Sequence, residues 1–545
     1  MTITHRLLLG AALSLLGAQR AESQDPAAPF IRAIITAGAL PEARHPLFRE
    51  QGGVLDALYA AHADQPFWDF GAGYTDFARA AIATLRAANE RGLDSVDYDV
   101  PRLDSLLTAG PETDPTRRSG RDLLLSLAVA RYLHDLRDGR VPEVPFEHVK
   151  PETPVAVAAA LLERAGGGEP VEALAREVEP HLAQYRNLLR QLSLYRQLAT
   201  TLVMRPLPRT LVRPGQRYAG RAELWRRLVA FGDLPSAVSF TPSSWYDSTL
   251  AQGVQRFQAR HALTPDGVLG RGTREALSIP PAHRVHQITL ALERLRWLPS
   301  LEGQRLLVVN VPAFELFAFD SIGGTGAPTL RMPVVTGGAF DHRTPVMIQP
   351  LRNVEFRPYW NVPRGILTAE ILPAIIRDSR FLAKERMEVL GVRDSVLGDS
   401  VTPAMLTALQ QGRFRVRQRP GPWNSLGLTK FNFPNRADVY FHGTPDTTVF
   451  HRARRDLSHG CIRLQDPAAL AAWALREVPG WDLSRIDSAL TGADTVRVPV
   501  QVKTAVLIFY TTAGATPEGG ILFYEDIYDH DQRLQVSLDA KSRAP

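Results

Sequence analysis

The hydrophobic pattern of this chain changes from helical to strand-like near residue 300, and this change constrains the fold more than any other feature. Before it, apolar residues recur at helical spacing, as in residues 77–86, 122–133 and 171–198. From Gln304 onward, short apolar runs alternate with turn residues, as strands do. A chain of 545 residues has room for about three or four domains. The sequence therefore predicts an α+β multidomain protein whose second half is mainly β.

Two large regions follow from this pattern. Residues 30–205 form a helical scaffold domain, in which no acid–base pair or metal cluster is recognisable. Residues 300–535 form a mainly-β domain, with strands expected at 306–311, 315–319, 332–338 and 439–442 and a last hairpin joining 505–510 to 521–524. Residues 364–418 interrupt that domain with a charged and helical pattern, so we expect a helical capping insertion there.

Residues 206–280 lie between these regions and carry a pattern of their own. Helices are expected at 222–231 and 249–261, followed by a turn at Asp266-Gly267 and a short last helix, 274–277, capped by Thr273. This segment resembles the small three-helix peptidoglycan-binding module, which implies that it binds peptidoglycan. A generic helical linker domain is the alternative.

The first residues are typical of an export signal. His5 and Arg6 supply a short basic region, residues 7–18 are apolar, and small and polar residues follow. We expect a signal peptide over residues 1–21 and hence a periplasmic protein. The alternatives are a buried helix and an uncleaved anchor near the inner membrane. No later stretch of the sequence is apolar enough to span a bilayer.

Composition and net charge exclude several classes of protein. Apolar residues make up 45% and charged residues 22%, which rules out a disordered chain, a coiled coil and a multi-span membrane protein. The net charge of +6 is too diffuse to indicate a nucleic acid partner.

There is a single cysteine, Cys461, and one thiol cannot pair within its own chain. In an exported protein it is either a buried small residue or a reactive group.

The surroundings of Cys461 favour a reactive thiol. It belongs to the run Ser458-His459-Gly460-Cys461-Ile462-Arg463, and His442 ends an earlier apolar run. A thiol attacks a carbonyl only as thiolate, and a nearby imidazole can take its proton and later donate it to a leaving amine. Both His442 and His459 qualify as that base. Gly460 predicts a tight bend whose N–H groups can stabilise an oxyanion.

These motifs resemble the L,D-transpeptidase family with a YkuD-type catalytic domain, whose signature is a histidine followed by Ser/Thr-His-Gly-Cys. Further segments are similar to the large periplasmic branch of that family: 293–299, 310–314, 344–345, 359–363 and 526–528. That branch combines a helical scaffold, a peptidoglycan-binding module and a catalytic domain with a capping insertion, in the order found here.

The resemblance implies a cysteine acyltransferase that acts on peptidoglycan and needs no cofactor. Cys461 would attack the carbonyl of the third residue of a tetrapeptide stem, release D-alanine and form a thioester. A side-chain amine of a neighbouring stem would then take the acyl group. His442 would be the proton donor and acceptor, and His459 and Gly460 would shape the nucleophile loop, with N–H groups near Gly460 and Cys461 as the oxyanion hole. The family also implies acylation of the thiol by carbapenems.

Four further residues are candidates for substrate binding: Arg463, Trp360, Trp423 and Gly443. Arg463 would hold a substrate carboxylate, unless it forms a structural ion pair. Trp360 and Trp423 would line the groove, unless they are ordinary buried aromatics. Gly443 follows the base where some relatives have Ser, which leaves open the group that orients the imidazole.

Other functions stay open at this point. His442, His451, His459 and Cys461 lie close enough in the sequence to suggest zinc, although their spacings are unlike those of zinc sites. A non-catalytic wall-binding scaffold would need only the peptidoglycan-binding module. The same Cys–His pair would serve an L,D-carboxypeptidase with water as acceptor, an exchange of D-amino acids, or the attachment of a lipoprotein. We expect the insertion at 364–418 to influence that choice by excluding water.

Overall fold

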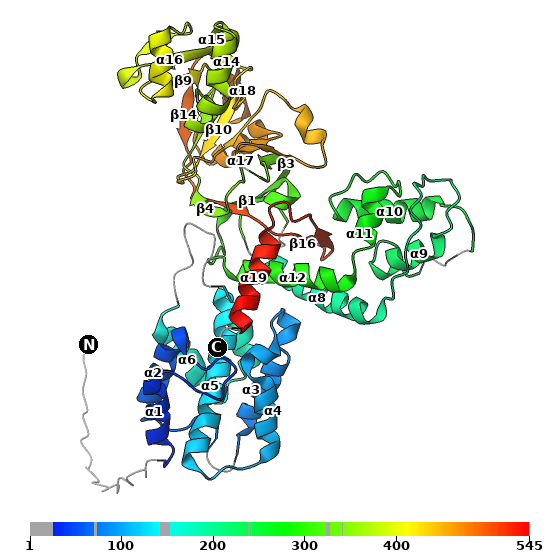
Figure 1. Cartoon of the computed structure of the whole chain (residues 1–545), viewed down its shortest axis with the longest axis vertical. Helices are drawn as coiled ribbons and strands as arrows, with labels where there is room; N and C mark the ends of the chain where they lie inside the picture. Colours follow the sequence, from blue (N-terminus) through cyan, green and yellow to red (C-terminus); the bar gives the residue numbers. More distant parts are fainter. Residues whose placement is uncertain are drawn as a thin grey trace, which may run out of the picture.

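In the computed structural model, the described residues are 25–69, 73–141, 153–237, 240, 242–322, 327–340 and 342–543. The expected signal peptide at residues 1–21 lies outside them. The chain forms a helical domain, a small helical module and a mainly-β domain, with the C-terminal helix between the first and the last (Figure 1). This confirms the predicted α+β multidomain architecture. Within the described ranges, no helix has the length and apolar character needed to cross a membrane.

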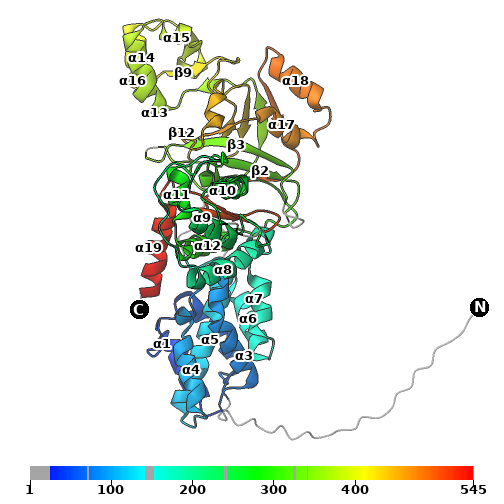
Figure 2. The same cartoon turned by 90° about the vertical axis from the view of Figure 1, so that its right-hand side faces the viewer.

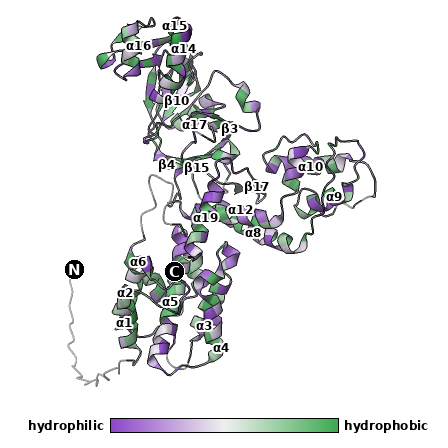
Figure 3. Ribbon diagram, in the orientation of Figure 1, coloured by the Kyte–Doolittle hydropathy of each residue, from purple (hydrophilic) through white to green (hydrophobic). Residues whose placement is uncertain are grey.

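The scaffold domain is built around one long helix, α5 (Pro115–Asp138), which is buried along most of its length. Asp114 caps its first turn by accepting a hydrogen bond from the Arg117 N–H at 2.9 Å, and Pro115 fits the next position because no donor is needed there. The surrounding helices interleave hydrophobic and hydrophilic residues, as amphipathic helices do (Figure 3). They are α1 (Ala28–Ala37), α2 (Gly52–Ala61), α3 (Asp76–Arg86), α4 (Val100–Ala109), α6 (Val155–Gly166) and α7 (Val171–Val178), with the short turns η1 (Arg49–Gln51), η2 (Ala88–Arg91) and η3 (Ser95–Tyr98).

The helical run expected at 171–198 is in fact two helices. α7 ends at Val178, and α8 (Ala183–Thr201) begins after Pro180, which has no N–H to donate and disfavours helix in the residue before it. α8 packs on α12 (Pro281–Arg296), and its buried tyrosines and leucines join the core of the β domain. One helix of the predicted scaffold span therefore supports the β domain.

The small module has the three helices that its pattern predicts: α9 (Arg221–Ala230), α10 (Ser248–Arg260) and α11 (Arg271–Leu277). Asp247 caps α10 by accepting a hydrogen bond from the Leu250 N–H at 3.0 Å. Thr273 does not cap the last helix, because α11 already begins at Arg271; its buried hydroxyl accepts a hydrogen bond from Gln258 at 3.1 Å. The module rests on the β domain through His261, whose ring stacks on Phe523 at 5.6 Å between centroids.

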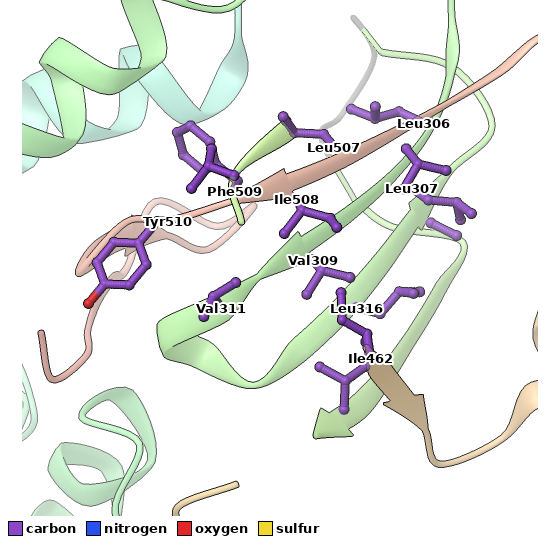
Figure 4. Close-up of a cluster of buried hydrophobic side chains, with 14 of the residues drawn as sticks. Leu306, Leu307, Val309, Val311, Leu316, Ile462, Leu507, Ile508, Phe509 and Tyr510 are labelled. Carbon is purple, nitrogen blue, oxygen red and sulfur yellow. The ribbon is translucent and has the colours of Figure 1, made fainter. Parts of the chain in front are cut away.

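The β domain is organised around one 11-stranded sheet in the order β14-β5-β10-β11-β13-β3-β2-β1-β15-β4, with β12 paired to β3. Its strands are β1 (Arg305–Asn310), β2 (Glu315–Phe319), β3 (Leu330–Gly337), β4 (Met347–Pro350), β5 (Asn353–Phe356), β10 (Thr429–Asn432), β11 (Phe441–His442), β12 (Asp456–Ser458), β13 (Ile462–Leu464), β14 (Val496–Pro499) and β15 (Thr504–Phe509). Figure 4 shows part of the buried core, in which Val309 and Leu316 of adjacent strands lie near Ile462 of β13. The domain is completed by α17 (Pro467–Leu475), α18 (Leu483–Thr491), η4 (Val311–Ala313), η7 (Thr448–His451) and the C-terminal helix α19 (His530–Arg543).

The last hairpin expected from the sequence is paired differently. β15 lies inside the large sheet between β1 and β4, and nearly all its residues are buried, as a continuous apolar run allows in a central strand. β17 (Ile521–Phe523) pairs instead with β16 (Ala513–Ala515), whose small residues carry little strand signal.

The insertion at 364–418 is mixed and not wholly helical. Its helical segments are α13 (Arg364–Ile366), η5 (Leu367–Ile371), α14 (Leu372–Arg377), α15 (Phe381–Lys384), η6 (Val392–Asp394) and α16 (Pro403–Gln410). A sheet in the order β6-β9-β7-β8 joins β6 (Trp360–Asn361), β9 (Arg415–Gln418), β7 (Met387–Leu390) and β8 (Val396–Gly398). The insertion together with β6 is called the cap below. It has a hydrophobic core of its own and stands at the top of the molecule in Figure 2.

Candidate active site

A row of polar side chains crosses neighbouring strands of the large sheet and includes His442. The strand register pairs Arg497 of β14 with Glu355 of β5, Glu355 with Lys430 of β10, Lys430 with His442 of β11, and His442 with Arg463 of β13. Because side chains alternate between the two faces of a strand, the intervening Phe441 and Ile462 lie on the core face. The five residues Arg497, Glu355, Lys430, His442 and Arg463 are called the polar row below.

Cys461 lies on the same face as the polar row. The Ile462 N–H donates to the Tyr440 carbonyl oxygen at 3.1 Å, so Cys461 is opposite Tyr440 and diagonal to His442. The thiol donates to the Asp438 carbonyl oxygen, with 3.6 Å between Sγ and oxygen. The fold thus places Cys461, directly before β13, diagonal to His442 on the adjacent parallel strand β11.

The imidazole of His442 is buried and oriented by the main chain. Its Nδ1 donates to the Gly443 carbonyl oxygen at 2.5 Å, and the Gly443 N–H donates to the Thr429 carbonyl oxygen at 3.0 Å. The group that orients the ring is therefore the carbonyl of Gly443 itself. In this tautomer Nε2 carries no proton and can accept one. Burial and the charge of Arg463 lower the pKa of His442 to about 3, which keeps the ring neutral at neutral pH.

The thiol of Cys461 is subject to opposing influences. Burial raises the pKa of Cys461, whereas hydrogen bonds from Tyr440 and the positive charge of Lys430 act to lower it. The balance leaves the pKa above its ordinary value. The resting pair is therefore a thiol beside a neutral imidazole, and proton transfer accompanies attack on a carbonyl.

Thr344 and Tyr528 help to fix the position of the nucleophile loop around Gly460 and Cys461. The Thr344 hydroxyl donates to the Gly460 carbonyl oxygen and accepts from the Gly337 N–H, both at 2.8 Å. The Tyr528 hydroxyl donates to the Gly337 carbonyl oxygen at 2.5 Å. A Cβ at Gly337 would collide with the backbone of His342 and Thr344 and would crowd Gly460, so these backbones can approach only because glycine stands there. Gly460 has a φ of +111°, which is the tight bend that the sequence predicts.

One of the two N–H groups expected in the oxyanion hole is already engaged. The Gly460 N–H donates to the Ser458 hydroxyl at 3.2 Å, and that hydroxyl donates to the Cys461 carbonyl oxygen. No described residue accepts a hydrogen bond from the Cys461 N–H. Of the two expected donors, the Cys461 N–H is therefore the one available to a developing oxyanion.

His459 links the nucleophile loop to the cap. Its Nε2 lies 2.7 Å from Oε1 of Glu370 in η5, and its ring lies 4.6 Å from that of His342 between centroids. Among the described residues, neither His459 nor His442 is hydrogen-bonded to the Cys461 sulfur, but the His459 ring is engaged by Glu370. The geometry therefore favours His442 over His459 as the base.

The four residues expected to bind substrate do not all lie together. Arg463 belongs to the polar row and forms no ion pair with a described residue, which favours a role with a substrate carboxylate over a structural pair. Trp360, on β6 of the cap, hydrogen-bonds the hydroxyl of Tyr440 at the edge of the site. Trp423 is 41% exposed and packs against Arg386 of the cap at 3.5 Å, away from the polar row. The carbonyl of Gly443 faces the base.

The histidines and the cysteine that suggested zinc are not gathered around one point. His459 is paired with Glu370, Nδ1 of His442 is bonded to Gly443, and His451 is exposed at the end of η7. In the part of the chain that the structure describes, no group of three or more His, Cys, Asp or Glu side chains is placed to hold a metal ion.

Three residues of the site, Lys430, Tyr440 and Glu370, were given no role from the sequence, and Thr344 was noted only within the segment 344–345 that resembles the family. Tyr440 lies two positions before His442 on an expected strand, so the alternation of side chains carried a signal for it. Lys430 and Glu370 reach the site through strand register and through the position of the cap, and the sequence pattern encodes neither.

Comparison with known proteins gives three family matches. The profile of the L,D-transpeptidase catalytic domain (YkuD) matches residues 304–508, that of a scaffold domain matches residues 53–192, and that of a "Putative peptidoglycan binding domain" matches residues 217–277.

One curated protein and one solved structure also match this chain. A protein of Haemophilus influenzae named "Putative L,D-transpeptidase" is 30% identical over 254 residues, which are 46% of this chain and 49% of that protein. The chain thus spans about half the length of this curated relative. Among solved structures, an L,D-transpeptidase from Xylanimonas cellulosilytica is 13% identical and covers 56% of this chain and 100% of its own, with a TM-score of 0.16, too low to carry an argument.

Proposed function

We propose that this chain crosslinks peptidoglycan stems, because residues 304–508 match the L,D-transpeptidase catalytic domain (YkuD) and other parts of the chain match a scaffold domain and a peptidoglycan-binding domain. The observation that carries the proposal is the position of Cys461, directly before β13, diagonal to His442 on the adjacent parallel strand β11, with the ring held by the Gly443 carbonyl. The expected signal peptide and the nature of the substrate favour the periplasm as the place of reaction.

Acylation uses the groups around Cys461. The thiol proton passes to Nε2 of His442 as Sγ attacks the carbonyl of the third residue of a tetrapeptide stem. The Cys461 N–H donates to the oxygen that becomes negative. The bond to the terminal D-alanine then breaks, its amine takes the proton from His442, and a thioester remains on Cys461.

Deacylation reverses these roles with a new amine. The side-chain amine of the third residue of a neighbouring stem attacks the thioester and gives a proton to His442, which returns it to the departing thiol. The product is an amide between two third residues. Arg463 would hold a substrate carboxylate, and Trp360 would line the groove beside Tyr440.

The acceptor decides among the reactions open to this pair. Water would make the chain an L,D-carboxypeptidase, and a free D-amino acid would give exchange. The cap favours crosslinking, because Glu370 holds it against the nucleophile loop, where it limits access of water to the thioester.

Intact mass spectrometry after incubation with a disaccharide tetrapeptide tests the proposal. We expect an adduct of the donor without D-alanine on the wild-type chain and none on Cys461→Ala. A carbapenem should give the same contrast. Soluble crosslinked dimers would identify transpeptidation, whereas released tripeptide would identify the carboxypeptidase. No adduct on a chain that still binds peptidoglycan sacculi would contradict the proposal and favour a non-catalytic scaffold.

A further inference from the structure

Lys430 occupies the middle of the polar row. Its strand, β10, is antiparallel to β11, and the register places Lys430 directly opposite His442. On the other side it is opposite Glu355 of β5. Its side chain therefore emerges on the face that carries His442 and Cys461, between an acidic neighbour and the base.

The ammonium group of Lys430 lies over the Tyr440 ring and forms no ion pair with Glu355, although the charge of Glu355 still acts on it. Nζ lies 3.9 Å from the centre of the Tyr440 ring. The Glu355 carboxylate forms an ion pair with Arg497 at 2.9 Å and accepts a hydrogen bond from the Asn432 amide at 3.4 Å. Within the described ranges, Lys430 forms no ion pair. A positive charge without a bonded anion thus sits on the ring of Tyr440.

Tyr440 connects this charge to the nucleophile. The Ile462 N–H donates to its carbonyl oxygen at 3.1 Å, which places Cys461 across from Tyr440. The Tyr440 hydroxyl lies close enough to the sulfur to interact with it and favours the thiolate. The ammonium of Lys430 is therefore separated from the thiol by the width of one aromatic ring, in a part of the protein that is largely shielded from water.

The other charged and titratable groups near the thiol are Asp438, Tyr440 and His442 before and on β11, Arg463 on β13, His459 in the nucleophile loop, and His342 and Glu370, which contact His459. His442 is held neutral by burial, and the Asp438 carboxylate opposes a thiolate. His459 is directed to Glu370. Lys430 and Arg463 carry the positive charges that favour the thiolate, and Lys430 is the stronger of the two influences on Cys461.

We propose that Lys430 is a positioning residue whose fixed positive charge, acting across the Tyr440 ring, stabilises the Cys461 thiolate in place of a protonated histidine. Lys430 stays protonated and exchanges no proton with the substrate. The biological meaning of this inference rests on the proposed function, whereas its experimental test does not depend on that function.

The test is the pH dependence of Cys461 alkylation by iodoacetamide in the full chain, which has no other thiol. We expect Lys430→Met to raise the apparent pKa of the thiol, so that alkylation at neutral pH slows about tenfold for each unit of the rise. Lys430→Arg keeps the charge and should restore most of the rate. Lys503→Met removes an exposed lysine of the same domain and should leave the profile unchanged. Thermal unfolding of each variant reports on the fold.

Superimposable pH profiles of the wild type and Lys430→Met would overturn the proposal. If the Met variant does not fold, Lys430→Gln, which keeps a polar head group, allows the same comparison with the wild type. The outcome is separate from that of the proposed function, because alkylation needs no peptidoglycan. A wild-type chain that forms no acyl adduct would refute the transpeptidase while the profiles of the Lys430 variants still decide this inference.

Discussion

The proposed catalytic pair of Cys461 and His442 is held by main-chain groups and by a hydroxyl, and no acidic side chain of a described residue is hydrogen-bonded to the imidazole. The Gly443 carbonyl fixes the tautomer of His442, and Thr344 fixes the Gly460 carbonyl next to Cys461. Carbonyl oxygens do not titrate, so the geometry of the pair does not change with pH. The protonation of the thiol is left as the variable that sets the reactivity of the resting site.

Replacing Thr344 by Val should loosen the nucleophile loop. Thr344 is 1% exposed, and the change removes its hydroxyl at almost constant shape, leaving the Gly460 carbonyl and the Gly337 N–H without their partner. An unsatisfied buried polar group costs about 1–3 kcal/mol. We expect a loss of this size in the free energy of unfolding in urea, together with slower acylation by a carbapenem.

Thr429→Val is the matched control for this change. Thr429 is also fully buried, on β10 beside the site, but its hydroxyl has no hydrogen-bond partner among the described residues. Its removal should cost little, and Thr344→Ser should recover most of the stability. Equal losses in the two Val variants would show that the Thr344 hydrogen bonds do not support the loop.

At the scale of elements, the sequence predicted strongly periodic segments well and paired strands poorly. β2 agrees with the expected 315–319, whereas β15 was assigned to a hairpin because 505–510 and 521–524 are neighbours in the chain. The true partner of β15 is β1, about 200 residues earlier, and such a non-local pairing leaves no local signal.

The same limit applies to the site. Cys461 and His442 carry a motif and were predicted from it. The polar row exists only once five strands are aligned, so Lys430 was not predicted, although it lies directly opposite His442. Gly460 shows a partial success: the bend was expected from the residue type, but the use of its N–H by Ser458 depends on a side-chain rotamer.

Glu370→Gln should make the cap easier to open. The Glu370–His459 pair joins η5 to the nucleophile loop, and its partners are 52% and 39% exposed. Such a pair contributes at most about 1 kcal/mol, which corresponds to about a fivefold change in an opening equilibrium. We expect alkylation of Cys461 by a bulky maleimide to accelerate relative to alkylation by iodoacetamide. Taking the ratio of the two rates removes any change in thiol reactivity.

Glu385→Gln serves as the control for that experiment. It changes the charge of the cap by the same amount at an exposed position that forms no ion pair with a described residue. Its ratio of rates should equal that of the wild type. A ratio that rises equally in both variants, or in neither, would mean that the contact between Glu370 and His459 does not keep the cap closed.

On the scale of the whole molecule, a buried ionic cluster joins the scaffold to the β domain. Glu293 and Arg296 of α12 pair at 3.2 Å, and Arg140, just after α5, approaches Glu293 at 3.4 Å. Arg296 also donates to the Arg91 carbonyl oxygen of the scaffold. The C-terminal helix adds a second link, since Lys541 lies 3.2 Å from Asp135 of α5 (Figure 1). The two domains are therefore coupled through a buried ionic cluster and a partly exposed ion pair.

Glu293→Gln should uncouple the scaffold from the β domain. Glu293 is fully buried, and the amide keeps its size but leaves Arg140 and Arg296 without their anion. Breaking a buried pair on one side costs about 3–5 kcal/mol. We expect calorimetry to show a lower first transition or two separate transitions, and small-angle scattering to show a larger radius of gyration.

The acid dependence of this variant gives an independent check. Although burial acts to raise the pKa of Glu293, Arg140 and Arg296 hold it below its ordinary value of 4.5. A carboxyl group with a depressed folded-state pKa contributes stability above its unfolded pKa and loses that contribution as the pH falls through the folded value. The wild type should therefore lose stability on acidification below about pH 4.5, and Glu293→Gln should lose less. Glu302→Gln, at an exposed position nearby, should follow the wild type throughout. If the two Gln variants unfold alike, the cluster does not couple the domains.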